Sequence, residues 1–387
     1  MIATSRHDEA GAARLLVADP ARSYRSLRTE IDAAIERVLD RGWFILGQEV
    51  ASFETEFAGY LGCRHAIGVA SGTDALRVAL IASGIAPGDE VITVANAGDP
   101  TPMAICSVGA VPRLVDVDPS SGTLSAESAE KAIGQRTRAL LPVHLYGQPA
   151  DLAGLSQLAR SAGLRLIEDA CQAHGARYRR QMVGTIGDFG CFSFYPTKNL
   201  GALGDGGMLV TNDDELAERA RLVREYGWKP RNHALIRGIN SRLDELQAAV
   251  LRVKLPCLET WNERRRALAA RYRRGLADLT AACPGLALPD ESPDCQHVYH
   301  LYVVQTDRRD AIRAALTGRG IGTGIHYPNP THLQPAFAGF WDRGPSLPVT
   351  ESLARRVLSL PMFPELTDGE VDRVVEEVQR AWAQQEA

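Results

Sequence analysis

Short apolar segments alternate with longer amphipathic stretches through the first two thirds of the chain. Runs such as Val-Ile-Thr-Val at 91–94 and Leu-Arg-Leu-Ile at 164–167 are typical of strands that a parallel sheet buries on both faces. Helical stretches separate these runs, so the pattern predicts a mainly parallel sheet covered by helices. The predicted strands are 66–70, 90–94, 111–117, 139–145, 164–168, 190–194 and 207–211.

Helical periodicity marks the segments on either side of this α/β region. Apolar residues recur at helical spacing from 26 to about 61, where a Gly-Trp-Phe-Ile-Leu-Gly loop interrupts them, and again from 243 to 258 as one long helix. Beyond 275 come a strand at 300–305, a proline-rich loop at 327–335 and closing helices. We expect a partly ordered arm over 1–25, a large α/β domain over 26–258 and a small α+β domain over 259–387.

Composition and charge limit the class of protein. With 45% hydrophobic and 23% charged residues over 387 positions, the chain reads as an ordinary globular protein long enough for two domains. The 43 basic and 47 acidic residues leave a net charge of −4, which argues against a general nucleic-acid binder.

Cysteine usage and hydropathy indicate the compartment. The seven cysteines are scattered and form no C-x-x-C pair, which is typical of reduced intracellular thiols. No apolar run reaches the length of about 18 residues that a membrane helix needs, and no His or Cys spacing indicates a metal site. The sequence predicts a cytoplasmic protein with no membrane segment and no metal.

Lys198 lies in an unusual setting for a surface charge. The strand-like run at 190–194 breaks at Pro196, and the lysine then precedes a glycine-rich run at 201–207. Such a segment can hold an amine still beside a bound carbonyl compound, and a lysine with a lowered pKa can form a Schiff base. A solvated lysine after a strand is the alternative, so the neighbouring motifs have to decide.

Two carboxylates, Glu168 and Asp169, end the predicted strand at 164–168. The carboxyl ends of parallel strands are where α/β proteins bind ligands. A carboxylate held there can pair with the protonated ring nitrogen of a pyridinium cofactor and keep that ring an electron sink. The alternative is a carboxylate that caps the helix after the strand.

A turn of small residues, Ser71-Gly72-Thr73, leads from a predicted strand into a helix. Free backbone N–H groups and the positive helix end favour a phosphate there, and Gly72 permits its close approach. The hydroxyl of Ser193 could add a donor. Such turns are common, but a phosphate cradle, a carboxylate and a lysine together match the needs of pyridoxal 5′-phosphate (PLP).

From about residue 43 onward, the chain resembles the DegT/DnrJ/EryC1/StrS family of PLP-dependent sugar aminotransferases. The resemblance implies a fold-type I aminotransferase that acts as a homodimer with active sites at the subunit interface. It is carried by the motifs at 44–47, 71–76, 87–91, 142–147, 168–170, 172–175, 192–207, 240–248 and 326–328.

The resemblance also implies roles for single residues. Lys198 would form the Schiff base with PLP and then move the proton between the cofactor and the sugar. Asp169 would pair with the pyridine nitrogen, and Gln172 would lie near the ring hydroxyl. The phosphate would be held by Gly72, Thr73, Ser193 and the partner subunit's Asn240. The sugar nucleotide would lie near His326 and Tyr327.

Two positions refine the expected chemistry. Relatives that act as dehydratases carry histidine where this chain has Lys198, so the lysine favours transamination. Many relatives follow the strand ending at Val94 with Ala-Asn-Thr-Phe, whose aromatic ring stacks on the cofactor. Here the run is Ala-Asn-Ala-Gly, with Gly98 at the aromatic position. Either another side chain covers that face of the ring, or the ring is packed less tightly.

The predicted reaction moves an amino group from glutamate, or alternatively glutamine, to the keto carbon of a dTDP-linked 3-keto-6-deoxyhexose of an antibiotic sugar pathway. The run at 95–98 and the loop at 326–334 resemble those of 3-keto enzymes. A 4-keto-sugar aminotransferase, a cyclitol (scyllo-inosose type) aminotransferase and a non-catalytic regulator are the alternatives. Candidate diphosphate ligands, each equally consistent with a solvated surface position, are Lys229, Arg231 and Arg242.

Overall fold

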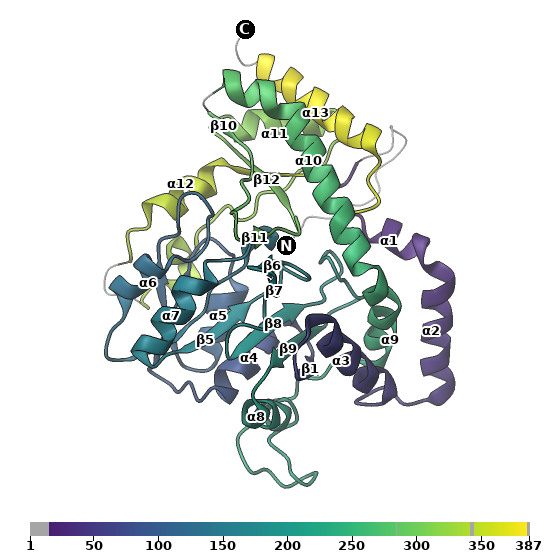
Figure 1. Cartoon of the computed structure of the whole chain (residues 1–387), viewed down its shortest axis with the longest axis vertical. Helices are drawn as coiled ribbons and strands as arrows, with labels where there is room; N and C mark the ends of the chain where they lie inside the picture. The colour runs from purple at the N-terminus through teal and green to yellow at the C-terminus, as the bar shows by residue number, and fades with distance from the viewer. Residues whose placement is uncertain (1–14, 284, 341–343, 385–387) are drawn as a thin grey trace.

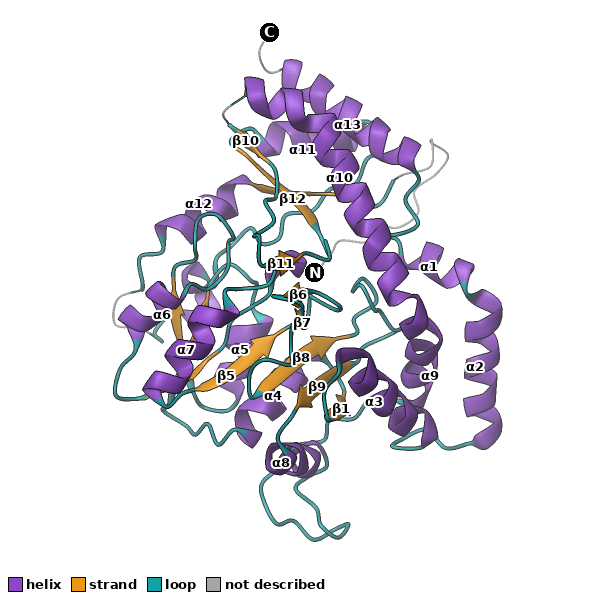
Figure 2. Cartoon of the chain, in the orientation of Figure 1, coloured by secondary structure: helices purple, strands orange, loops and turns teal. Residues whose placement is uncertain are grey.

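A computed structural model describes residues 15–283, 285–340 and 344–384 of the chain. A seven-stranded sheet lies in the lower half of the molecule, and a smaller sheet with α10, α11 and α13 stands above it (Figure 1). Figure 2 shows strands in the middle of the lower region, with helices around them. The prediction of a mainly parallel α/β sheet with a smaller α+β part is confirmed.

The large sheet has the strand order β1-β9-β8-β5-β4-β2-β3, and each of its strands corresponds to a predicted one. Neighbours from β3 to β8 run parallel, whereas β9 runs antiparallel to both β8 and β1. The bounds are β1 His65–Val69, β2 Glu90–Val94, β3 Val111–Val115, β4 Thr137–Leu140, β5 Arg165–Asp169, β8 Phe189–Ser193 and β9 Gly207–Thr211.

Helices bury both faces of this sheet. Along β9, Leu209 packs on the side of α4, α5 and α8, while Met208 and Val210 pack on the side of α3. This alternation follows from the two-residue period of a strand and explains why these strands are apolar throughout. The bounds are α4 Gly72–Ala82, α5 Pro100–Ser107, α6 Ala126–Ala132, α7 Leu152–Ala162 and α8 Asp214–Arg224.

The N-terminal helices are α1 Pro20–Ser26, α2 Arg28–Arg41 and α3 Gln48–Leu61, so the predicted helical region and its loop at 42–47 are confirmed. The described part of the predicted arm contains α1. Leu15 pairs with Ile321 of the C-terminal part, and Arg22 bonds Glu370 of α13 at 2.7 Å. The first fourteen residues of the arm lie outside the described residues.

The predicted continuous helix over 243–258 is wrong in its bounds and its continuity. The structure has α9 at Glu245–Lys254, a 3₁₀ turn at Leu255–Cys257 and α10 at Leu258–Ala282. The interruption falls at Pro256, which has no N–H to donate to the preceding helical turn. Helix α10 then joins two cores, because Leu258 packs in the core between the large sheet and α3, and Leu268 packs in the core of the small sheet.

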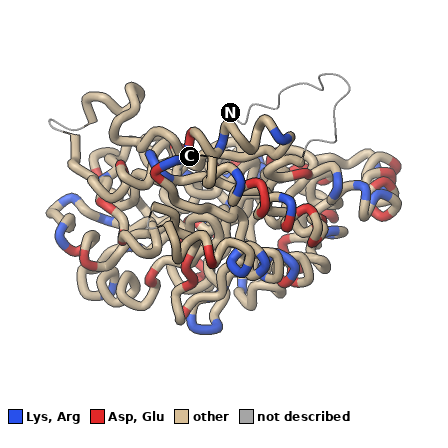
Figure 3. The backbone as a smooth tube through the Cα atoms, turned by 90° about the horizontal axis from the view of Figure 1, so that it is seen from above, with Lys and Arg blue, Asp and Glu red and all other residues tan. Residues whose placement is uncertain are grey.

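The basic segment 264–274 lies within α10 and faces acidic residues of α13 (Asp368–Ala383). Arg271 bonds Asp372 at 2.6 Å and Asp368 at 2.9 Å, and Arg264 bonds Asp368 at 2.8 Å. Figure 3 shows basic and acidic residues interspersed along the backbone. These ion pairs give the basic run a role in helix packing.

Two small sheets complete the described fold. One joins β10 Leu286–Ala287, β12 Tyr302–Thr306 and β13 Val357–Leu360, and the other joins β6 Arg177–Tyr178, β7 Gln181–Met182 and β11 Cys295–Gln296. The remaining helices are α11 Arg309–Gly318 and α12 Pro348–Arg356, with 3₁₀ turns at Leu145–Gly147, Thr331–Leu333 and Pro335–Phe337. Within the described residues, no helix combines the length and the apolar character that crossing a membrane requires.

Candidate active site

The predicted phosphate turn and the end of β8 are in direct contact. A Cβ atom placed on Gly72 would lie 2.6 Å from Cβ of Ser193 and 2.9 Å from Sγ of Cys171. Any side chain at position 72 would therefore collide with the neighbouring strand. Because β1, β5 and β8 run in the same direction, their carboxyl ends bring together the three segments that the sequence singled out.

The turn also leaves backbone donors free at the start of α4. The Ser71 hydroxyl accepts the N–H of Asp74 at 3.1 Å and so caps the helix. In the described part of the chain, no protein group accepts a hydrogen bond from the N–H of Gly72 or Thr73. Two free donors at the positive end of an 11-residue helix are suited to bind a phosphate.

Asp169 is buried at the end of β5, and two donors fix the direction of its carboxylate. The hydroxyl of Thr101 donates to one oxygen at 2.6 Å, and the backbone N–H of Cys171 donates to the other at 3.1 Å. Turns follow Asp169 rather than a helix, so the alternative of a helix cap is wrong. Sequence reasoning missed Thr101, which lies in the first turn of α5 beyond β2.

Glu168 points to the other side of β5 and has a structural role. Its carboxylate has no exposed surface and accepts backbone N–H groups at 2.7–2.8 Å from Gly184, Ile186 and Gly187. It also accepts from Nε2 of His144 at 3.0 Å; that nitrogen carries the proton, because Nδ1 accepts the N–H of Ala150. Of the two predicted carboxylates, only Asp169 is available to the site.

The half-buried side chain of Lys198 has no hydrogen-bond partner for its amine among the described residues. Burial lowers its pKa from the ordinary 10.5, and the nearby Asp169 charge opposes that shift. The Cys171 thiol is also close, but burial raises its own pKa well above 9.0, so it stays neutral. The lysine is thus shifted toward the neutral amine that a Schiff base or a general base requires.

We expect the amine of Lys198 to titrate below 10.5, with its neutral fraction at each lower pH larger than that of a free lysine. Competitive acetylation of the cofactor-free protein against added Nα-acetyl-lysine, read by mass spectrometry across pH, measures this shift. Between the lowered pKa and 10.5 the unfolded chain binds more protons at this site, so the stability contribution of Lys198 rises with pH there. Coincident titration curves would contradict the expectation.

Gln172 links the ends of the large sheet to the loop that follows residue 325. Its Oε1 accepts the backbone N–H of Tyr146 at 2.9 Å, and its Nε2 donates to the hydroxyl of Tyr327 at 3.1 Å. The Tyr146 hydroxyl in turn donates to the carbonyl of His326. Burial lowers the pKa of His326 to about 4, so the ring is neutral. The structure thus brings Gln172, His326 and Tyr327 together and adds Tyr146, which lies in the motif at 142–147 but has no role assigned from the sequence.

The predicted phosphate and diphosphate ligands after α8 differ in their exposure and in their bonding partners. Asn240 is exposed and pairs with Glu225, while the next residue, Ser241, accepts the N–H of Ala70 beside the phosphate turn at 3.0 Å. Lys229 forms an exposed ion pair with Glu218. Arg231 is exposed and Arg242 is partly buried. Their roles stay predictions.

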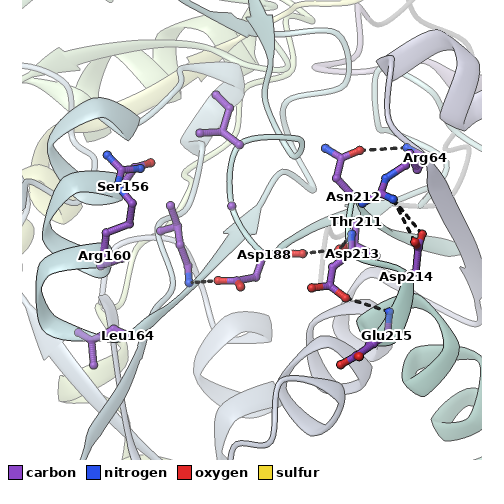
Figure 4. Close-up of a pocket in the computed structure, with 14 residues that line it drawn as sticks. Arg64, Ser156, Arg160, Leu164, Asp188, Thr211, Asn212, Asp213, Asp214 and Glu215 are labelled. Carbon is purple, nitrogen blue, oxygen red and sulfur yellow. Dashed lines mark hydrogen bonds and ion pairs between the residues drawn. The ribbon is translucent and has the colours of Figure 1, made fainter.

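A large cleft lies where β5 begins and β9 ends, and Lys198 is not among the residues that line it (Figure 4). Its volume is about 810 Å³. Three of its four acidic lining residues are engaged locally: Asp214 with Arg64 at 3.1 Å, Asp188 with Arg165 at 2.7 Å, and Asp213 as the cap of α8. Among the described residues, no group of three or more His, Cys, Asp or Glu side chains is placed to hold a metal ion.

Comparison with known proteins identifies the family. Residues 25–379 match the model of the DegT/DnrJ/EryC1/StrS aminotransferase family. The chain belongs to this family. Aminotransferases of the DegT/DnrJ/EryC1/StrS family depend on PLP, and the protein is accordingly a PLP-dependent aminotransferase.

Close relatives cover almost the whole chain. It is 52% identical over 362 residues, 94% of each chain, to a dTDP-3-amino-3,4,6-trideoxy-α-D-glucose transaminase of Streptomyces venezuelae. The structure of S. venezuelae DesV with a ketimine intermediate is 50% identical, with a TM-score of 0.92 over 96% of this chain and 99% of DesV. NtdA of Bacillus subtilis, solved with the bound cofactor PMP, is 33% identical, with a TM-score of 0.91 over 98% of this chain and 87% of NtdA. The family members thus share the fold-type I architecture.

The residues of this DegT/DnrJ/EryC1/StrS protein fit the family's cofactor. Among the described residues, the site presents two N–H groups without an acceptor for a phosphate, a carboxylate with a fixed direction and an unpaired amine shifted toward neutrality. Bound PLP supplies an electron sink for the reacting carbon. The protein would supply the groups that hold it and the base that moves a proton.

Proposed function

We propose that the protein transfers the amino group of glutamate to the C3 keto carbon of a dTDP-linked 6-deoxyhexose in aminodeoxysugar biosynthesis. The observation that carries the transamination is Lys198, whose amine has a lowered pKa, lies close to Asp169 and has no hydrogen-bond partner in the described part of the chain. The choice of C3 is supported by the 52% identity to the S. venezuelae transaminase, whose name specifies a 3-amino sugar.

We propose the following roles within this site. Asp169, held by Thr101, pairs with the ring nitrogen of PLP, and Gln172 lies near the ring hydroxyl. Lys198 attaches the cofactor and moves the proton. The phosphate ligands are Gly72, Thr73, Ser193 and the partner subunit's Asn240. His326 and Tyr327 lie near the sugar nucleotide.

A homodimer in the cytoplasm with shared active sites is part of this proposal. Its support is a run of exposed large apolar side chains before α3, in which Trp43 is 64% and Phe44 46% exposed. Tyr195, three residues before Lys198, is 45% exposed and lies near the proposed site in sequence. Exposed large apolar side chains that lie next to one another, such as Trp43 and Phe44, are typical of a protein–protein interface.

Glutamate alone should convert the cofactor absorbance of the purified protein from the lysine-bound form to the pyridoxamine form in a single turnover. Replacing glutamate with glutamine tests the alternative donor. A protein that holds PLP but shows no conversion with either amino acid would contradict the aminotransferase assignment and favour a non-catalytic regulator.

The keto position is tested with matched dTDP-linked 3-keto and 4-keto 6-deoxyhexoses, each incubated with the protein and glutamate. We expect amination of the 3-keto sugar, with the new amine located on C3 by NMR. Scyllo-inosose serves as the cyclitol comparison. Preferred amination of the 4-keto sugar or the cyclitol would overturn the choice of substrate and leave the glutamate half-reaction intact.

A further inference from the structure

Two loops that are far apart in sequence form one unit above the carboxyl end of β2. The N–H of Thr331 donates to the carbonyl of Ala95 at 3.0 Å, and the Thr331 hydroxyl donates to the carbonyl of Gly98 at 3.4 Å. Nε2 of Gln334 donates to the carboxylate of Asp99 at 2.7 Å. These bonds join the segment 95–99, which follows β2, to the segment 327–334 of the C-terminal part. We call the segment 95–99 the β2 loop and the segment 327–334 the proline loop.

A side chain at Gly98 of the β2 loop would crowd the ring of Tyr327. Its φ of +79° belongs to the left-handed region that favours glycine. A Cβ atom there would lie 3.1 Å from Cε1 and 3.2 Å from Cδ1 and Cζ of Tyr327. Such contacts are closer than ordinary van der Waals contact. The ring of Tyr327 therefore fills the space into which a side chain at position 98 would project.

The ring of Tyr327 is held from several sides. It packs against the apolar cluster that contains Val94, Ala97 and Val143. Its hydroxyl accepts Nε2 of Gln172 at 3.1 Å. Burial raises the pKa of this phenol to about 12, so the side chain is neutral at physiological pH. A neutral aromatic ring with so many fixed contacts is suited to be a rigid wall.

The ring of Tyr327 is connected to the residues that are proposed to hold the cofactor ring. Gln172, which holds the Tyr327 hydroxyl, lies three residues after Asp169 in the turn that follows β5. Gly98, which the ring covers, lies three residues before Thr101, whose hydroxyl fixes Asp169. The ring thus bridges the β2 side and the β5 side of the site. The family resemblance places a cofactor-stacking aromatic side chain at position 98 in many relatives, and this chain has a glycine there.

We propose that Tyr327 is the aromatic side chain that faces the pyridine ring of the cofactor in this protein, in place of the missing aromatic at position 98. The wall then comes from the proline loop of the C-terminal part rather than from the β2 loop. This role goes beyond a position near the sugar. It concerns cofactor binding alone, so it does not depend on which sugar is the substrate.

The test is binding of pyridoxamine 5′-phosphate to the full-length cofactor-free protein, measured by calorimetry and by the circular dichroism induced in the cofactor absorbance band. Loss of an aromatic stacking partner should weaken binding of Tyr327→Ala by about 5- to 150-fold and remove most of the induced dichroism. Tyr327→Phe keeps the ring and should bind within about threefold of the unchanged protein. No sugar is present, so failure here is distinct from failure of the proposed function.

Leu333→Ala is the matched control, because Leu333 lies in the same loop and is 61% exposed. It should leave both readouts unchanged, and an equal loss there would overturn the proposal by showing a general disturbance of the loop. Unchanged binding by Tyr327→Ala would overturn it, as would an equal loss in Tyr327→Phe, which would assign the effect to the hydroxyl and Gln172. If Tyr327→Ala does not fold, Tyr327→Leu replaces it in the comparison with Tyr327→Phe.

Discussion

Replacing Lys198 with alanine should abolish covalent attachment of the cofactor and lower transamination by about 10³-fold or more. The side chain has two proposed tasks, because it binds the cofactor and moves the proton during amino transfer. The chain has three other lysines, and two of them, Lys131 and Lys229, are exposed in ion pairs. Lys254 is buried, and its amine donates to the carbonyl of Gly201 at 2.7 Å.

Borohydride reduction followed by peptide mapping measures this expectation directly. The reduced cofactor should label the peptide that contains Lys198 and no other, and Lys198→Ala should remain unlabelled. Lys131→Ala removes an exposed lysine and should keep both label and activity. Burial lowers the pKa of Lys254 to about 8, which makes it the next most reactive candidate; label on Lys254 would show that the anchor was assigned wrongly.

Replacing Glu168 with alanine should lower the free energy of unfolding by about 4 kcal/mol or more, since each buried donor left unsatisfied costs roughly 1–3 kcal/mol. The change would leave three backbone N–H groups of the segment 184–187 without an acceptor, together with Nε2 of His144. The removed side chain would also leave a cavity in the core. We expect the variant to be obtained only at low temperature or with the cofactor bound.

Thermal and urea unfolding of the cofactor-free protein compare this variant with Glu127→Ala. Glu127 forms an exposed pair with Lys131 on α6, and its loss should change stability by less than about 0.5 kcal/mol. Glu168→Gln should fall between the two, because the amide keeps one acceptor and turns an N–H group toward other donors. A loss below about 1 kcal/mol in Glu168→Ala would mean that water replaces the carboxylate.

The sheet and the centre of the site could be predicted because their signals are local. Each strand of the large sheet is buried on both faces and is therefore apolar throughout, which separates it from the amphipathic helices. Lys198, Asp169 and the turn at Gly72 follow directly after strands. Their convergence then follows from the parallel direction of those strands.

Other features could not be predicted because their partners are distant or because one local signal has two meanings. Thr101 and Asp169 are 68 positions apart, and no pattern near either residue indicates their contact. Glu168 and Asp169 are both carboxylates at the end of the same predicted strand, so the sequence does not distinguish them. Their side chains point to opposite sides of β5, which makes Glu168 structural and leaves Asp169 available to the site. Pro256 is a local signal for the break between α9 and α10, because it has no N–H to donate, but the apolar periodicity continues through it and indicates one helix.

The contact between Gly98 and Tyr327 also constrains the order in which this site can change. An alanine at position 98 would meet both the left-handed backbone and the tyrosine ring, so that substitution alone should be harmful. Shortening Tyr327 first removes the collision and leaves only the backbone strain. In a directed-evolution experiment that selects an aromatic residue at position 98, Tyr327 should therefore be replaced before the new aromatic residue appears. Libraries that vary the β2 loop alone would miss that route.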